Sequence, residues 1–118
     1  MHSPNPLFPA IRKIAGEWVL VHPRVLTSEI THTEPHIVAW LDELLHPRDT
    51  FFDVGANCGW LALRAARRVG PSGRVVAFEP APVLAEMLAY HKRVNRSAQL
   101  THHRRRRALR GLRGKTSG

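Results

Sequence analysis

The segment that most constrains this chain is a short turn with two glycines, Gly55-Ala56-Asn57-Cys58-Gly59, between a strand-forming and a helix-forming segment. Residues 50–54 before it are rich in β-branched and aromatic side chains and lack polar alternation, so we expect a central strand that is buried on both faces. Residues 60–69 after it carry apolar side chains at helical spacing, and Gly70 with the following proline ends that pattern. A strand, a glycine turn and a helix in direct succession are typical of α/β folds.

The chain downstream of this helix repeats the alternation. Residues 74–78 predict a second buried strand, Glu79 follows it, and a second helix is expected from about Pro82 to Val94. Two strands connected through a helix should be parallel, with a right-handed crossover. We therefore predict the opening half of a doubly wound α/β domain.

The chain upstream of the turn is less regular. A helix is predicted from about Glu34 to Leu45, with Thr31 or Thr33 as its N-cap and Pro35 in its first turn, where a missing N–H is tolerated. Residues 17–21 suggest a short strand, and three prolines within the first nine residues argue against regular structure before it.

Three positions around the turn have properties that suit a nucleoside ligand. Gly55 allows a sharp turn and a close approach of the backbone to a ligand, and Gly59 opens a helix whose free N–H groups can face polar groups. Glu79 stands twenty residues beyond Gly59, at the carboxyl end of the neighbouring strand. A carboxylate there can accept hydrogen bonds from both ribose hydroxyls, so we predict an adenosine site.

The glycine spacing indicates which adenosine ligand is bound. Dinucleotide-binding folds use G-x-G-x-x-G, in which two glycines two apart let a pyrophosphate contact the backbone. Asn57 occupies the place of that second glycine here, and its side chain would crowd a pyrophosphate. Asp53 could bind the ammonium group of a ligand with an amino-acid end. These residues favour S-adenosylmethionine, and an NAD-dependent oxidoreductase fragment remains the alternative.

Two runs carry a resemblance to a known family: Phe51-Phe52-Asp53-Val54-Gly55-Ala56-Asn57-Cys58-Gly59-Trp60 and Gly73-Arg74-Val75-Val76-Ala77-Phe78-Glu79-Pro80-Ala81-Pro82. Residues 34–97 resemble the FkbM-type family of S-adenosylmethionine-dependent methyltransferases. The resemblance implies a Rossmann-like class I methyltransferase fold and methylation of a hydroxyl on a small molecule or sugar. By position it implies that the methionine and ribose side is lined by Asp53, Gly55, Asn57 and Gly59 and that Glu79 holds the ribose, whereas it identifies no catalytic residue.

The resemblance stops near residue 101, where later strands of such folds would supply the acceptor site and any catalytic base. We therefore expect a truncated fragment with an N-terminal extension (1–33), a partial cofactor-binding domain (34–100) and an Arg-rich disordered tail (101–118). The tail has the composition that out-of-frame translation of a GC-rich gene produces, and we hypothesise that it is such a remnant or the end of a truncated gene. Half of a doubly wound sheet should be marginally stable, aggregation-prone or dependent on a partner.

The net charge of +9 comes from the end of the chain. Residues 1–91 hold eight basic and nine acidic side chains, whereas residues 92–118 hold ten basic and no acidic ones. The rival interpretation is therefore a non-catalytic protein whose tail binds polyanions, nucleic acid included, without base specificity.

The remaining composition argues against several other classes of protein. One cysteine excludes an intrachain disulfide, and no apolar run approaches the ~20 residues of a membrane span, so we expect a cytoplasmic protein without a membrane partner. His32 and His36 stand four apart but lack the residue order of zinc proteases, so we predict no metal site.

Overall fold

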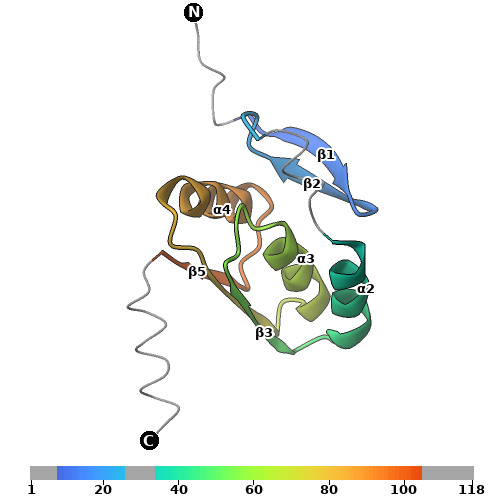
Figure 1. Cartoon of the computed structure of the whole chain (residues 1–118). Helices are drawn as coiled ribbons and strands as arrows, with labels where there is room; N and C mark the ends of the chain where they lie inside the picture. Colours follow the sequence, from blue (N-terminus) through green and yellow to red (C-terminus); the bar gives the residue numbers. More distant parts are fainter. Residues whose placement is uncertain (1–7, 26–33, 105–118) are drawn as a thin grey trace, which may run out of the picture.

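The computed structural model describes residues 8–25 and 34–104 of the chain, which form a β-hairpin and an α/β unit with one layer of helices on one parallel sheet (Figure 1). The elements in chain order are β1 (Ala10–Ile14), β2 (Glu17–Val21), α2 (Pro35–Leu44), β3 (Thr50–Val54), α3 (Trp60–Val69), β4 (Arg74–Phe78), α4 (Pro82–Val94) and β5 (Leu100–His103). No helix among these residues has the length and apolar character needed to cross a bilayer.

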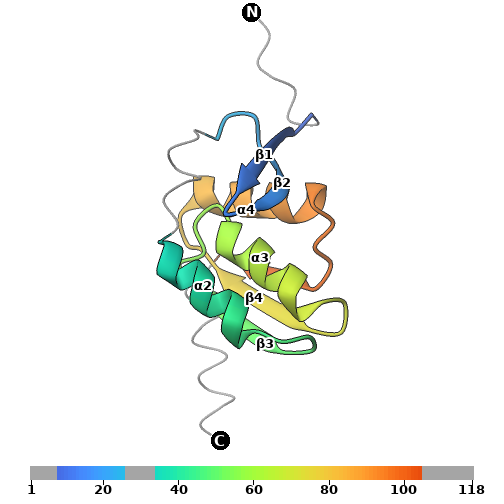
Figure 2. The same cartoon turned by 90° about the vertical axis from the view of Figure 1, so that its right-hand side faces the viewer.

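The main sheet is parallel, with the strand order β3-β4-β5. Figure 2 shows the helices on one side of this sheet, with the hairpin lying beyond them. Alanines of α3 allow the helix to approach the sheet closely, and the core is formed by Ala62, Leu63, Ala65, Ala66, Val69, Val75, Ala77, Leu88 and Leu100. The predicted α/β fold with parallel strands is therefore confirmed.

The position of β3 differs from the sequence-based prediction. It was expected to be a central strand that is buried on both faces, but it is an edge strand next to β4. Phe52 and Val54 are 54% and 64% exposed because no described element covers the sheet face opposite the helices. The apolar composition of this strand therefore did not correspond to burial here.

The predicted helices and strands agree closely with the structure. The expected strand at residues 17–21 is β2, and α2 begins at Pro35 and ends at Leu44, with Glu34 as its N-cap and no side-chain capping bond. The predicted caps Thr31 and Thr33 lie outside the described residues.

The strand β1 was not predicted from the sequence. It pairs antiparallel with β2, so that Ile14 lies opposite Glu17. The two residues between them, Ala15 and Gly16, both have positive φ angles (47° and 85°), as a type I′ hairpin turn requires. The three prolines at positions 4, 6 and 9 argued against regular structure in this region, but all of them precede β1, which begins at Ala10.

The carboxyl-terminal strand β5 includes residues that were expected to belong to the tail. Val75 to Phe78 of β4 pair in parallel with Leu100 to His103. The boundary predicted at residue 100 therefore falls inside a strand, because the apolar Leu100 anchors this segment to the core. Residues 105–118 lie outside the described part, and the disorder expected for them remains a prediction.

Candidate functional site

The loop between β3 and α3 bends over the end of β4. The amides of Gly55 and Ala56 both donate to the carbonyl oxygen of Phe78, over 2.9 and 3.0 Å. Gly55, Asn57 and Gly59 have φ angles of 75°, 59° and 99°, so three residues within five lie in the left-handed region. Glycine adopts this region at little cost, whereas for Asn57 surrounding contacts have to hold it there.

Glu79 makes the contact that holds Asn57. Its Oε1 accepts a hydrogen bond from the backbone N–H of Asn57 (2.9 Å), and its Oε2 accepts one from the N–H of Ala81, the N-cap of α4 (3.0 Å). Its own N–H donates to the carbonyl of His103 (3.0 Å). The side chain is 7% exposed. This residue therefore joins the glycine loop, the start of α4 and the end of β5.

Asp53 lies at the end of the neighbouring strand β3, opposite Ala77 of β4. The residue is 9% exposed, and its Oδ2 is buried without a hydrogen-bond partner in the described part of the chain. Burial, and then the charge of Glu79, raise the pKa of Asp53 to about 6. An ionised carboxylate in this position is uncompensated, and a cationic group of a ligand would compensate it.

The two glycines of the loop have different surroundings. A Cβ at Gly55 would meet no atom within 4 Å, whereas a Cβ at Gly59 would collide with the Cδ1 of Leu88 on α4. Gly55 and Asn57 are exposed, so a ligand can approach the backbone there. Gly59 is required by the packing of the loop against α4.

The structure thus brings all five predicted site residues to the carboxyl edge of the sheet: Asp53, Gly55, Asn57, Gly59 and Glu79. The methionine end of S-adenosylmethionine carries an ammonium group, which suits the unpaired oxygen of Asp53. The open side of Gly55 leaves space beside the backbone. These residues therefore fit this ligand, although their role in binding it remains a prediction.

No role was predicted for His91, which lies on α4. It is 0% exposed, and its Nδ1 lies 2.7 Å from the carbonyl oxygen of Cys58 in the glycine loop. Burial lowers the pKa of His91 to about 4. The one signal in the sequence was a histidine at helical spacing from Leu84, Met87 and Leu88. This pattern does not reveal which groups the imidazole contacts.

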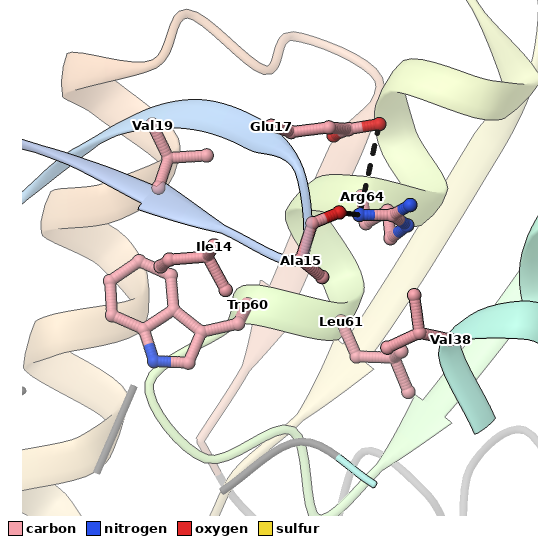
Figure 3. Close-up of a pocket in the computed structure, with 8 residues that line it drawn as sticks. All are labelled: Ile14, Ala15, Glu17, Val19, Val38, Trp60, Leu61 and Arg64. Atoms are coloured by element: carbon pink, nitrogen blue, oxygen red, sulfur yellow. Dashed lines mark hydrogen bonds and ion pairs between the residues drawn. The ribbon is translucent and has the colours of Figure 1, made fainter. Parts of the chain in front are cut away.

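A separate pocket lies between the hairpin, α2 and α3, as Figure 3 shows. Its lining is mainly aliphatic, and Arg64 at its rim donates to the carbonyl of Ala15 (3.0 Å) and pairs with Glu17 (3.9 Å). Arg64 also makes two bonds to the carboxylate of Asp42 (2.7 and 2.5 Å). The pocket therefore belongs to the contact between the hairpin and the helices. It does not include the carboxyl ends of β3 and β4, where the predicted site residues lie.

Comparisons with known proteins agree with this geometry. A family model described as protein-L-isoaspartate(D-aspartate) O-methyltransferase matches residues 19–104. The protein-L-isoaspartate O-methyltransferase 2 of Archaeoglobus fulgidus is 45% identical over 58 residues, which are 48% of this chain and 26% of that protein. The matched segment thus spans about a quarter of this relative's length.

Two solved structures share the fold. A protein-L-isoaspartate O-methyltransferase superposes with a TM-score of 0.58 at 21% identity, over 79% of this chain and 29% of that one. The O-methyltransferase TomG from Streptomyces achromogenes, solved in complex with S-adenosylmethionine, gives a TM-score of 0.59 at 22% identity, over 72% and 39% of the two chains.

These findings correct one part of the sequence-based resemblance. They support a class I S-adenosylmethionine-dependent methyltransferase, but they point to the isoaspartate enzymes and not to the FkbM-type family. A hydroxyl of a small molecule or sugar as the methyl acceptor is likewise not supported. The motifs that carried the resemblance, residues 51–60 and 73–82, lie inside the segment that the isoaspartate family model matches.

Proposed function

The chain belongs to the protein-L-isoaspartate(D-aspartate) O-methyltransferase family, and we propose that it binds S-adenosylmethionine at the carboxyl ends of β3 and β4 for methyl transfer to proteins. The acceptor in this proposal is the carboxylate of an isoaspartyl residue. The observation that carries the proposal is the buried Oδ2 of Asp53, which has no hydrogen-bond partner among residues 8–25 and 34–104, beside a loop whose Asn57 N–H donates to Glu79. S-adenosylmethionine would supply the methyl group: a carboxylate oxygen would bond to the methyl carbon while the bond from that carbon to the positively charged sulfur breaks, leaving a methyl ester and neutral S-adenosylhomocysteine.

The site residues have distinct roles in this proposal. Asp53 pairs with the ammonium group of the methionine part, and this pairing offsets the cost of its own burial. Glu79 uses one lone pair of each oxygen on a backbone N–H, so both oxygens can still accept from ribose hydroxyls. Gly55 gives access to the backbone, and the left-handed Asn57 gives Glu79 its backbone contact. Gly59 keeps the loop packed on α4.

The proposal assigns cofactor binding to residues 34–103 and assigns no residue to acceptor binding or proton transfer. Methyl transfer depends largely on holding the two reactants in line. Residues 34–103 supply groups for one of these reactants, S-adenosylmethionine. We infer that transfer requires acceptor-binding segments corresponding to the larger part of the relatives that this chain does not span.

The test combines cofactor binding with transfer to a peptide. The purified chain is titrated with S-adenosylmethionine, and methylation is then assayed with an isoaspartyl peptide and with the same peptide carrying an ordinary aspartate. We expect saturable binding by the chain alone, and label only on the isoaspartyl peptide when the acceptor-binding segments of a relative are joined to the chain. The control for variants of the site carboxylates Asp53 and Glu79 is Glu86→Gln, which removes an exposed carboxylate from α4 and should leave binding unchanged. A folded chain that does not bind the cofactor, or that methylates both peptides equally, contradicts the proposal.

A further inference from the structure

The imidazole of His91 lies between the glycine loop and the amino-terminal hairpin. Its Nδ1 is 2.7 Å from the carbonyl oxygen of Cys58, and its Nε2 is 3.0 Å from the backbone nitrogen of His22, the residue after β2. The ring is fully buried and packs against the indole of Trp60, with 4.2 Å between the ring centres. One side chain thus contacts two segments that are far apart in the sequence.

The two hydrogen bonds fix which nitrogen of His91 carries the proton. The backbone N–H of His22 can only donate, so Nε2 must present its lone pair. The carbonyl of Cys58 can only accept, so Nδ1 must be protonated and donate to it. The ring is therefore neutral and each nitrogen has a single role, which agrees with the lowered pKa of this buried group.

On the loop side, His91 and Glu79 bind the peptide groups on either side of the one that links Asn57 to Cys58. Glu79 binds the N–H of Asn57, and His91 binds the carbonyl of Cys58. The residues that flank Cys58, Asn57 and Gly59, both have positive φ angles, and for Asn57, which is not a glycine, this conformation costs about 1–3 kcal/mol. These two side chains help to stabilise a loop conformation that the backbone alone does not favour.

On the hairpin side, α4 provides the matching contacts. Next to His91, the side chain of Asn95 accepts from the N–H of Leu20 (2.9 Å) and donates to its carbonyl (2.7 Å). An isolated two-stranded hairpin is at best marginally stable in water. The docking of β2 therefore depends in part on polar side chains of α4, and one of them, His91, also binds the glycine loop at residues 55–59.

We propose that His91 is a positioning residue that makes the ligand-ready conformation of the 55–59 loop and the docking of the hairpin depend on each other. This inference rests on the proposed function, because it assigns the hairpin a role in cofactor binding. By reciprocity, a ligand that orders the loop must also stabilise the docked hairpin. The hairpin thereby contributes to affinity without touching the ligand.

Two variants separate the two hydrogen bonds. In His91→Asn, the amide nitrogen can take the place of Nδ1 and still donate to Cys58, but the acceptor for His22 is lost. In His91→Gln, the amide oxygen can take the place of Nε2 and still accept from His22, but the donor to Cys58 is lost. His36→Asn, at an exposed position on α2, is the control.

The readouts are amide hydrogen exchange, followed by NMR, and the affinity for S-adenosylmethionine. In His91→Asn, which loses the bond to His22, we expect faster exchange at the amide of His22. We also expect about tenfold faster exchange at Asn57 and Gly59, although these residues flank Cys58, whose bond to residue 91 is kept. We expect the cofactor dissociation constant to rise by a similar factor. In the wild type, added cofactor should slow the exchange at His22, and it should do so less in both variants.

The outcomes separate this inference from the proposed function. If His91→Asn changes only the hairpin amides and leaves the loop amides and the affinity at wild-type values, the coupling is overturned. If the folded wild type binds no S-adenosylmethionine, the proposed function fails. The exchange at Asn57 and Gly59 in the variants then decides the coupling alone, since it requires no ligand.

Discussion

The ends of β3 and β4 each present a carboxylate to the same edge of the sheet, and the two are used differently. Glu79 after β4 accepts two backbone hydrogen bonds and ties the loop to α4. Asp53 on β3 is buried to a similar degree, yet one of its oxygens has no partner in the described structure. Two residues with the same functional group thus differ in how many of their carboxylate oxygens accept a hydrogen bond from the described part of the protein.

The difference separates a residue that builds the site from one that is left for the ligand. Removing Glu79 should damage both the fold and cofactor binding, because two backbone N–H groups lose the carboxylate that accepts from them. Removing the charge of Asp53 should weaken binding but make the ligand-free protein more stable, because burying that charge costs free energy when no ligand is present. Stability and affinity should therefore change together at one carboxylate and in opposite directions at the other.

The largest effect is expected for Glu79→Ala. This change removes the acceptor of the N–H groups of Asn57 and Ala81, and each lost hydrogen bond should cost about 0.5–1.5 kcal/mol because both are only partly buried. We expect a clear fall in the free energy of unfolding, measured by urea denaturation, and loss of cofactor binding. Glu86→Ala on the same helix is the matched control. An unchanged denaturation midpoint for Glu79→Ala would show that its two hydrogen bonds do not hold the loop.

Asp53→Asn should instead stabilise the protein that carries no ligand. A pKa raised from 3.8 to about 6 means that folding disfavours the ionised form, and each unit corresponds to about 1.4 kcal/mol. Because the amide of asparagine also needs partners, we expect a net gain of about 1–2 kcal/mol at neutral pH. A destabilised Asp53→Asn would contradict the view that this carboxylate lacks a partner in the free protein.

The two glycines offer a matched pair of the same substitution. Gly59→Ala should be the more damaging because it combines a φ of 99° with a collision against Leu88. Gly55→Ala has open space around it, so only the left-handed strain remains, about 1–2 kcal/mol. Thermal denaturation of both variants measures the difference. Equal losses would mean that the packing of the loop on α4 contributes nothing.

The pH dependence should separate stability from binding. The folded state holds the proton of Asp53 up to about pH 6, whereas the unfolded chain releases it near pH 3.8. The contribution of Asp53 to stability therefore falls as the pH rises from about 4 to about 6. Cofactor affinity should rise over the upper part of this range, as the carboxylate ionises. Denaturation and calorimetry at pH 5 and 7.5 test both trends, and both should disappear in Asp53→Asn.

The smallest effect on stability is expected on the open face of β3. Phe52→Thr and Val54→Thr replace exposed side chains and should change the free energy of unfolding by only about 0.5 kcal/mol. Because an exposed apolar edge strand promotes association, both should reduce aggregation measured by light scattering. A large loss of stability would mean that these side chains are covered in solution.

The sequence was sufficient to predict the fold around the site and the residues that gather there. Parallel strands bring their carboxyl ends to one edge, so Asp53, the loop glycines and Glu79 had to be neighbours. Sequence could not assign Glu79 its two backbone partners, because these depend on the bend of the loop over β4. The edge position of β3 and the contacts of His91 were hidden for a related reason: local patterns reveal that a residue is apolar or on a helix face, but not which segment packs against it.

The affinity of the wild type and of Asp53→Asn for S-adenosylmethionine, measured by calorimetry at pH 7.5, tests the central claim most directly. The account predicts saturable binding to the wild type and binding at least about tenfold weaker to Asp53→Asn, a loss of 1.4 kcal/mol or more, even though that variant is the more stable protein. Equal affinities, or no binding by a folded wild-type chain, would contradict the claim that the unpaired carboxylate is there for the ligand.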